Sequence, residues 1–223
     1  MLLQLKNISK GYGEPGTHSF RPVLDKLNLE IKKGERLSIV GPSGSGKTTL
    51  LNLIGALDLP DAGEVIFNGS DLTSYSKDRL ATFRNQNLGF VFQLHHLMPQ
   101  LTLMENILLP VLAHGKTSKD DKNWAEHLVR KVGVWEQRNQ KPAEMSGGEC
   151  QRTAVVRALI NKPELILADE PTGALDEENA TALTDLLLEL SAEEGVTLVT
   201  VTHSAEMANK MERKLTLKNG QLH

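Results

Sequence analysis

One short segment limits the possible folds of this chain more than any other, the run Gly41-Pro42-Ser43-Gly44-Ser45-Gly46-Lys47-Thr48-Thr49. It matches the pattern G-x-x-x-x-G-K-[ST], and it joins a strand-like apolar segment, residues 37–40, to a helix-like one, residues 48–54. Glycines let backbone N–H groups curl around an anion, and a helix N-terminus favours negative charge. Lys47 can neutralise the β- and γ-phosphates, and the Thr48 hydroxyl suits Mg²⁺. The run therefore predicts a phosphate-binding loop, with every residue from Gly41 to Thr49 at the nucleotide.

Composition restricts the class of protein further. The 223 residues, of which 39% are hydrophobic, suffice for one large α/β domain or a domain with an inserted lobe. A net charge of −3 lacks the excess of positive charge that is typical of nucleic-acid-binding proteins. The single cysteine, Cys150, excludes a disulfide within the chain. No apolar run approaches the ~20 residues of a membrane helix, and residues 1–6 do not resemble a signal peptide. We expect a cytoplasmic protein that reaches a membrane only through a partner.

The first 35 residues predict a β-rich opening. Residues 2–8 and 23–31 alternate between apolar and polar side chains, as half-buried strands do, while residues 11–16 have the composition of a turn. Tyr12 precedes the second of these strands. It is interpreted either as an aromatic ring that stacks on adenine or as an ordinary packing tyrosine, and both interpretations stay open at this stage.

Polar residues follow three further strand-like segments. Gln93 ends the run 88–92, Asp169 and Glu170 end the run 165–168, and His203 ends the run 196–202. These segments alternate with helical patterns, which favours a mostly parallel sheet. Ligands bind beyond the carboxyl ends of such strands, so the four polar residues are expected at the same edge as the phosphate-binding loop.

In residues 94–155 the apolar side chains recur at helical spacing, which predicts an inserted helical subdomain. Residues 1–93 and 156–223 are then expected to form the core of a single domain that spans residues 1–223. Within the insertion, residues 116–121 are interpreted as a charged linker. Apolar residues of 94–112 are interpreted either as core or as a groove for a partner's helix, with Leu97 and Met98 expected to be exposed. Ser146-Gly147-Gly148 precedes a clear helix, whose N-terminus suits a phosphate.

With these motifs in this order, the whole chain resembles the ATP-binding subunits of ABC transporters. Met145-Ser146-Gly147-Gly148-Glu149 resembles the family's signature motif, in which Glu149 stands where the family has Gln. The segment 165–170 is similar to the Walker B strand with its catalytic glutamate. By the same resemblance, Gly173-Ala174-Leu175-Asp176 is the D-loop, Gln93 the Q-loop, His203 the switch histidine and Tyr12 the A-loop aromatic.

The resemblance implies fold, chemistry and cofactors. The expected fold is a P-loop NTPase core with a mostly parallel sheet, an N-terminal antiparallel β subdomain and the helical insertion. The implied activity is hydrolysis of ATP with Mg²⁺, and two subunits are implied to enclose two ATP molecules. The implied roles are as follows: Thr48, Gln93 and Asp169 hold Mg²⁺; Glu170, His203 and Gln93 act in catalysis; Tyr12, Ser146, Gly147, Gly148, Glu149 and Asp176 bind nucleotide.

A narrower resemblance covers the pattern from Arg84 to Pro110, which is similar to the lipoprotein-releasing and macrolide-efflux subgroup. Members of this subgroup drive a membrane partner by mechanotransmission. The implied partner is an integral-membrane permease, and the implied location is the inner face of the bacterial plasma membrane. The alternative is a regulatory ATPase of the same family that controls cell-division or cell-wall machinery and transports nothing.

Overall fold

The computed structural model describes residues 1–14, 16, 19–113 and 115–223. These residues form two compact units. The first contains residues 1–84 and 197–223, and the second contains residues 85–196. The predicted subdomain limits at 93/94 and 155/156 stay a prediction.

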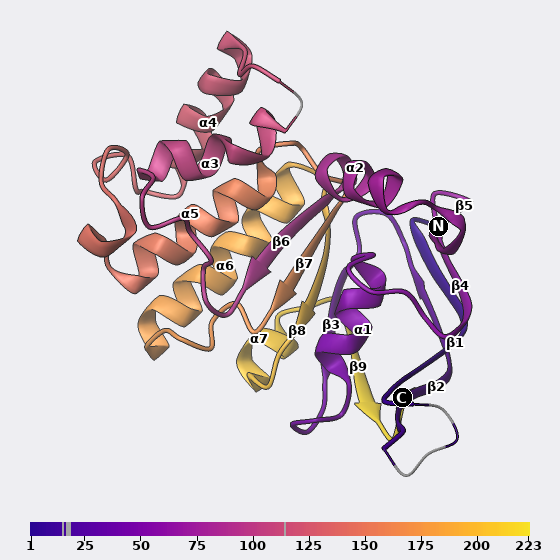
Figure 1. Ribbon diagram of the computed structural model, residues 1–223. Helices are drawn as coiled ribbons and strands as arrows, with labels where there is room; N and C mark the ends of the chain where they lie inside the picture. The colour runs from indigo at the N-terminus through magenta and orange to yellow at the C-terminus, as the bar shows by residue number, and fades with distance from the viewer. Residues whose placement is uncertain (15, 17–18, 114) are drawn as a thin grey trace. The chain divides into compact units, whose positions relative to one another are not determined.

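An antiparallel sheet opens the first unit (Figure 1). Its strands, in spatial order, are β2 (Arg21–Ile31), β1 (Leu3–Tyr12), β4 (Ala62–Phe67) and β5 (Ser70–Asp71). Leu3 lies opposite both Ile31 and Phe67, and all three are buried because alternate residues of each strand face the core. The turn predicted at residues 11 and 12 is wrong, since β1 continues to Tyr12, which pairs with Arg21.

A second group of strands in this unit is mainly parallel. β3 (Arg36–Val40) pairs in parallel with β8 (Thr197–Val201) and with β9 (Arg213–Lys218), and β10 (Gln221–Leu222) turns back against β9. Helix α1 (Lys47–Ile54) contacts β8, and α7 (Ala205–Asn209) contacts β3. A 3₁₀ turn, Leu72–Ser74, leads to helix α2 (Lys77–Asn87), which passes from the first unit into the second.

The described residues of the second unit form a parallel strand pair and four helices. β6 (Leu88–Phe92) pairs with β7 (Leu165–Asp169), so that Phe92 lies opposite Asp169. The helices are α3 (Leu103–Leu112), α4 (Lys119–Lys131), α5 (Gly147–Leu159) and α6 (Glu177–Glu193), with a 3₁₀ turn at Pro142–Glu144. Helices α3 and α4 contact α5 (Figure 1). A Cβ atom on Gly89 would lie 2.3 Å from the carbonyl oxygen of Ala158, so β6 and α5 approach closely at that glycine.

Helix α4 corrects the linker predicted for residues 116–121. It begins at Lys119 because Ser118 and Asp121 form a capping box: the amide of Ser118 donates to Asp121 Oδ2 at 2.8 Å, and the amide of Asp121 donates to Ser118 Oγ at 3.1 Å.

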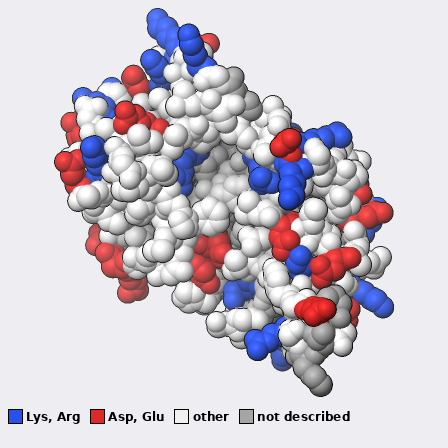
Figure 2. All heavy atoms as spheres, viewed as in Figure 1, with Lys and Arg blue, Asp and Glu red and all other residues white. Residues whose placement is uncertain are grey.

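Within the described parts of the chain, no helix is both long and apolar enough to cross a membrane. On the face seen in Figure 2, basic and acidic side chains are interspersed.

Candidate nucleotide-binding site

The loop between β3 and α1 has the geometry of an anion cradle. Gly44 and Gly46 adopt left-handed φ values of 74° and 98°, which side chains disfavour. A Cβ atom on Gly46 would lie 2.6 Å from Val23 Cγ1, so only glycine fits there. No described side chain caps α1, which leaves its first-turn amides available to an anion. Lys47 Nζ donates to the carbonyl oxygens of Gly41 and Pro42, both at 3.0 Å, and thereby lies across the loop.

Tyr12 lies at the end of β1 and near the start of α1. Its hydroxyl is 3.5 Å from Thr49 Oγ1 and 3.2 Å from Asp58 Oδ2, while 46% of the residue remains exposed. The interpretation of Tyr12 as a purely core residue therefore does not hold. An exposed ring beside the phosphate-binding loop is suited to stacking on a base.

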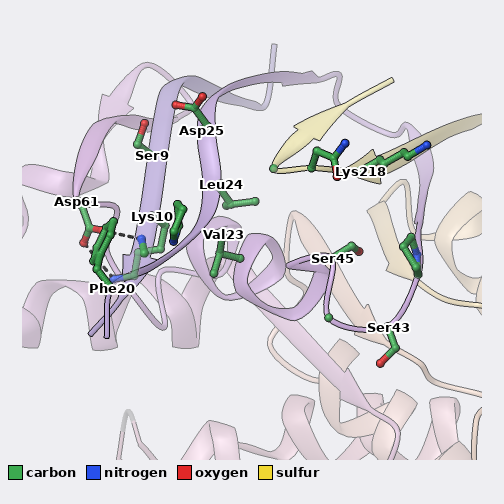
Figure 3. Close-up of a pocket in the computed structure, with 16 residues that line it drawn as sticks. Ser9, Lys10, Phe20, Val23, Leu24, Asp25, Ser43, Ser45, Asp61 and Lys218 are labelled. Carbon is green, nitrogen blue, oxygen red and sulfur yellow. Dashed lines mark hydrogen bonds and ion pairs between the residues drawn. The ribbon is translucent and has the colours of Figure 1, made fainter. Parts of the chain in front are cut away.

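A cavity of about 800 Å³ adjoins the loop in the first unit (Figure 3). Its lining combines P-loop residues with strand and hairpin residues: Ser9, Lys10, Gly11, Phe20, Pro22, Val23, Leu24, Asp25, Pro42, Ser43, Gly44, Ser45, Asp61, Lys218, Asn219 and Gly220. Most of these come from β1, β2 and the β9–β10 turn, and the sequence pattern did not point to them. The amide of Asp25 donates to Gly220 O at 3.1 Å, and this contact brings the two distant segments together.

His203 belongs to the same unit as the phosphate-binding loop. It follows β8, and the amide of the preceding residue, Thr202, donates to Ile39 O of β3 at 3.2 Å. The carboxyl ends of β3 and β8 therefore lie side by side, as predicted for a parallel pair. His203 itself is exposed at this edge.

In the second unit, the predicted Q-loop and Walker B residues follow paired strands. Gln93 comes directly after Phe92, which lies opposite Asp169. The side-chain amide of Gln93 packs against Gly173. A Cβ atom at position 173 would lie 2.9 Å from Gln93 Nε2. Glu170 has a left-handed φ of 48°, an uncommon conformation for a residue with a side chain. Such strain is often retained where a side chain must be aimed for function.

The signature segment forms the N-terminus of α5. Ser146 is the N-cap residue: its hydroxyl accepts from the amide of Glu149 at 3.3 Å, and the Glu149 carboxylate accepts from the amide of Ser146 at 2.7 Å. Glu149 thus completes a capping box. A Cβ atom on Gly148 would lie 3.1 Å from Asn179 Oδ1. The amide and side chain of Asn179 bond to Asp176 and hold its pKa below the usual range.

The predicted residues therefore fall into two sets. The first unit groups Tyr12, the phosphate-binding loop and His203, while the second groups Gln93, the Asp169–Glu170 pair, the signature segment and Asp176. The described residues contain no group of three or more His, Cys, Asp or Glu side chains that could hold a metal by themselves. Mg²⁺ at a nucleotide requires oxygen ligands, several of which come from phosphates and water. The hydroxyl, amide and carboxylate oxygens of Thr48, Gln93 and Asp169 fit that requirement chemically.

The segment after Gln93 is partly apolar and exposed. Leu94, Met98 and Leu112 are 65%, 49% and 50% exposed. Leu97, by contrast, is only 7% exposed, so its predicted exposure is wrong. Of the residues nearest Gln93, Leu94 and Met98 therefore present exposed apolar side chains.

Comparison with known proteins identifies the class. Residues 24–173, more than half of the chain, match the family described as ABC transporter. The chain belongs to the ABC transporter family. The predicted fold class is confirmed, since the chain superimposes on the dimeric ATP-binding cassette MJ0796, in a post-hydrolysis state bound to ADP and Pi, with a TM-score of 0.90. That similarity has 40% identity and covers 100% of this chain and 97% of the other.

Among curated proteins, this chain is similar to the lipoprotein-releasing system ATP-binding protein LolD. It is 44% identical to LolD of Idiomarina loihiensis over 222 residues, covering 100% of this chain and 96% of the relative. It is 47% identical to LolD 1 of Rhodopirellula baltica over 224 residues, covering 99% and 96%. These similarities confirm the predicted class of enzyme, an ABC-type ATPase.

Proposed function

We propose that this chain is the ATP-hydrolysing subunit of a lipoprotein-releasing ABC system and drives an integral-membrane permease. One observation carries the proposal: the similarity to LolD proteins extends over essentially the full length of both chains at 44% and 47% identity. The subgroup pattern from Arg84 to Pro110 agrees with it. Through its permease, the protein works at the cytoplasmic face of the bacterial inner membrane.

Nucleotide binding is assigned to the first unit. The amides of the loop and Lys47 hold the phosphates, with Gly44 and Gly46 providing the curvature. The hydrogen bonds from Lys47 Nζ to two loop carbonyls support this role, because phosphate oxygens can replace those neutral acceptors with charged ones. Tyr12 stacks on the adenine ring.

Hydrolysis is assigned to residues that follow the strand ends. Glu170 orients a water molecule and takes its proton as the water oxygen bonds to the γ-phosphorus, while the bond to the β,γ-bridging oxygen breaks. His203 contacts the γ-phosphate and keeps the water in line. Thr48, Gln93 and Asp169 would hold Mg²⁺, which would supply neutralising charge at the phosphates. The left-handed backbone of Glu170 supports a role that depends on its direction.

The signature segment is assigned to the opposite subunit of a two-fold dimer. Ser146, Gly147 and Gly148 present a helix N-terminus to the γ-phosphate bound at the partner copy's loop, with Glu149 holding the cap and Asp176 at the same interface. The dimeric form of the similar cassette MJ0796 supports this arrangement. ATP then joins the two copies, and hydrolysis releases them.

The exposed apolar side chains of Leu94 and Met98 are assigned to contact with the permease. Leu94 directly follows Gln93 and Met98 lies five residues after it, so a change at the γ-phosphate has a short path to the partner. Met98→Ser should lower the amount of permease recovered with the protein from detergent extracts of native membranes, with ATP binding unchanged. Leu57→Ser, an equally exposed residue of the first unit, serves as the control.

The proposal as a whole is tested by depleting the protein in its host. Lipoproteins should then accumulate in the inner-membrane fraction, and expression of the wild-type chain, but not of Lys47→Ala, should restore their release. Normal lipoprotein distribution together with a division or cell-wall defect would instead support the regulatory alternative.

A further inference from the structure

A cluster of four side chains, which we call the Lys10 cluster, joins the end of β1 to the segment after α1. Its members are Lys10, Tyr12, Asp58 and Asp61. Lys10 Nζ donates to Asp58 Oδ1 at 3.0 Å and to the carbonyl oxygen of Leu59 at 2.8 Å, and it lies 3.6 Å from Asp61 Oδ1. Only 11% of the Lys10 side chain is exposed, against 33% for Asp58. A cation this shielded from water needs such partners.

The cluster contacts Tyr12 at two points and the preceding residue, Gly11, at a third. Asp58 Oδ2 accepts from the Tyr12 hydroxyl at 3.2 Å, and Lys10 Nζ lies 5.4 Å from the centre of the tyrosine ring. The backbone just before Tyr12 is fixed as well, because the amide of Gly11 donates to Asp61 Oδ2 at 2.7 Å. The two carboxylates thus fix both the ring and its backbone. Figure 3 shows Lys10 and Asp61 directed toward one another at the cavity wall.

Both charges of the central pair are retained. Burial alone would raise the pKa of Asp58, but the hydrogen bond from Lys10 and those from the Leu59 amide and Tyr12 outweigh it, so the pKa is lowered. Burial would likewise lower the pKa of Lys10, and its bond to Asp58 more than reverses that effect. The pair therefore stays ionised at neutral pH.

Asp58 also connects Tyr12 to the phosphate-binding loop. It follows α1, the helix that begins at Lys47, and its amide bonds to the carbonyl oxygen of Asn52 in that helix at 3.3 Å. Asn52 O also accepts from the amide of Leu57 at 2.9 Å. The position of the tyrosine ring relative to the phosphate-binding loop is therefore determined through this short segment.

We propose that Asp58 and Lys10 are positioning residues that hold the Tyr12 ring for stacking on the base of the nucleotide. The inference rests on the proposed role of Tyr12 in adenine binding, and it adds residues that determine how well the base, as distinct from the triphosphate, is recognised. Neither residue belongs to the phosphate-binding loop, residues 41–49. Their loss should weaken only the part of the affinity that comes from the nucleoside.

Titration calorimetry with two probes, ATP and inorganic tripolyphosphate, tests the proposal. Base stacking on an aromatic ring corresponds to about 5- to 150-fold in affinity, so Tyr12→Ala should weaken ATP binding within that range and leave tripolyphosphate binding unchanged. Asp58→Ala should weaken ATP binding about 3- to 10-fold, again without effect on tripolyphosphate. Glu64→Ala, which removes an exposed acid from β4, should bind both probes as the wild type does.

A double-mutant cycle separates positioning from general destabilisation. In the Tyr12→Ala background, Asp58→Ala should cause no further loss of ATP affinity, because the ring it positions is gone. Tyr12→Phe keeps the ring but removes the hydroxyl that donates to Asp58. This variant disturbs no buried group and should reproduce part of the loss of ATP affinity seen in Asp58→Ala.

The adenine-stacking role of Tyr12 and the positioning role of Asp58 would be contradicted by different results. Unchanged ATP affinity in Tyr12→Ala would remove the adenine-stacking role from the proposed function. A normal Asp58→Ala and a normal Tyr12→Phe beside a weakened Tyr12→Ala would overturn the positioning inference alone. Equal loss of ATP and tripolyphosphate in Asp58→Ala would also overturn it, since the defect would then lie in the phosphate-binding loop.

Discussion

The buried side chain of Gln151 donates a hydrogen bond of 2.7 Å to the carbonyl oxygen of Phe92. The same amide nitrogen donates to the carbonyl oxygen of Pro171 at 2.9 Å. Gln151 belongs to α5, the helix that starts at the signature serine, while Phe92 and Pro171 adjoin Gln93 and Glu170. One side chain therefore links the signature helix to both strand ends that carry predicted catalytic residues.

Gln151→Leu should destabilise the protein by about 1–3 kcal/mol, because a buried carbonyl oxygen at Pro171 and a partly buried one at Phe92 lose their donor. Urea unfolding measures the difference. We also expect ATP hydrolysis to fall more than ATP binding, since the linked residues act after the nucleotide is bound. Gln86→Ala, an exposed glutamine on α2, is the control and should change neither quantity. Wild-type stability in Gln151→Leu would show that the two bonds contribute little.

Lys47→Ala should abolish measurable ATP binding, because the ammonium group that lies across the loop provides the only side-chain cation proposed at the phosphates. Fluorescence titration with a labelled ATP analogue measures the loss. Lys77→Ala, an exposed lysine on α2, should bind as the wild type does. Tight binding by Lys47→Ala would contradict the role given to the loop.

Glu170→Gln keeps the volume and the left-handed backbone of Glu170 but cannot accept the proton of the attacking water. The variant should bind ATP, accumulate as a dimer and hydrolyse ATP about 10²- to 10⁴-fold more slowly. Steady-state phosphate release and size-exclusion chromatography with ATP measure these effects. Glu178→Gln, on the exposed start of α6, should hydrolyse normally. A fast Glu170→Gln enzyme would remove the assignment of Glu170 as the base.

His95 gives the protein a predicted dependence on pH. Burial, the Arg157 guanidinium and His96 lower the pKa of His95, whose Nδ1 accepts from the amide of Leu97 at 3.1 Å. Because the unfolded chain binds the proton more readily, stability should fall as pH drops below about 6.5 and be unaffected by this group above it. Urea midpoints between pH 8 and 5.5 should show a flatter dependence for His95→Gln, with the pH 8 values reporting the non-ionic cost of the substitution. Parallel curves for the two proteins would contradict the prediction.

Local sequence patterns predicted the phosphate-binding loop, the start of α5 and the strands that precede Gln93, Asp169 and His203. The conformation of each of these segments is determined mainly by residues close to one another in the sequence. The Lys10 cluster was not predictable in this way. Lys10 and Asp58 have no shared motif and meet only because β1 pairs with β4 in the folded sheet. The start of α4 was missed for a different reason: the Ser118–Asp121 capping box was a readable signal that the surrounding charges obscured.

The contact between Gly173 and the Gln93 amide has a consequence for sequence variation. With 2.9 Å between Gln93 Nε2 and a Cβ atom at position 173, even one methyl group would push the glutamine aside. Alanine at this position would therefore require the Gln93 side chain to take another position. A change that looks conservative, in a turn remote along the chain, would thereby move a side chain assigned to the Mg²⁺ site.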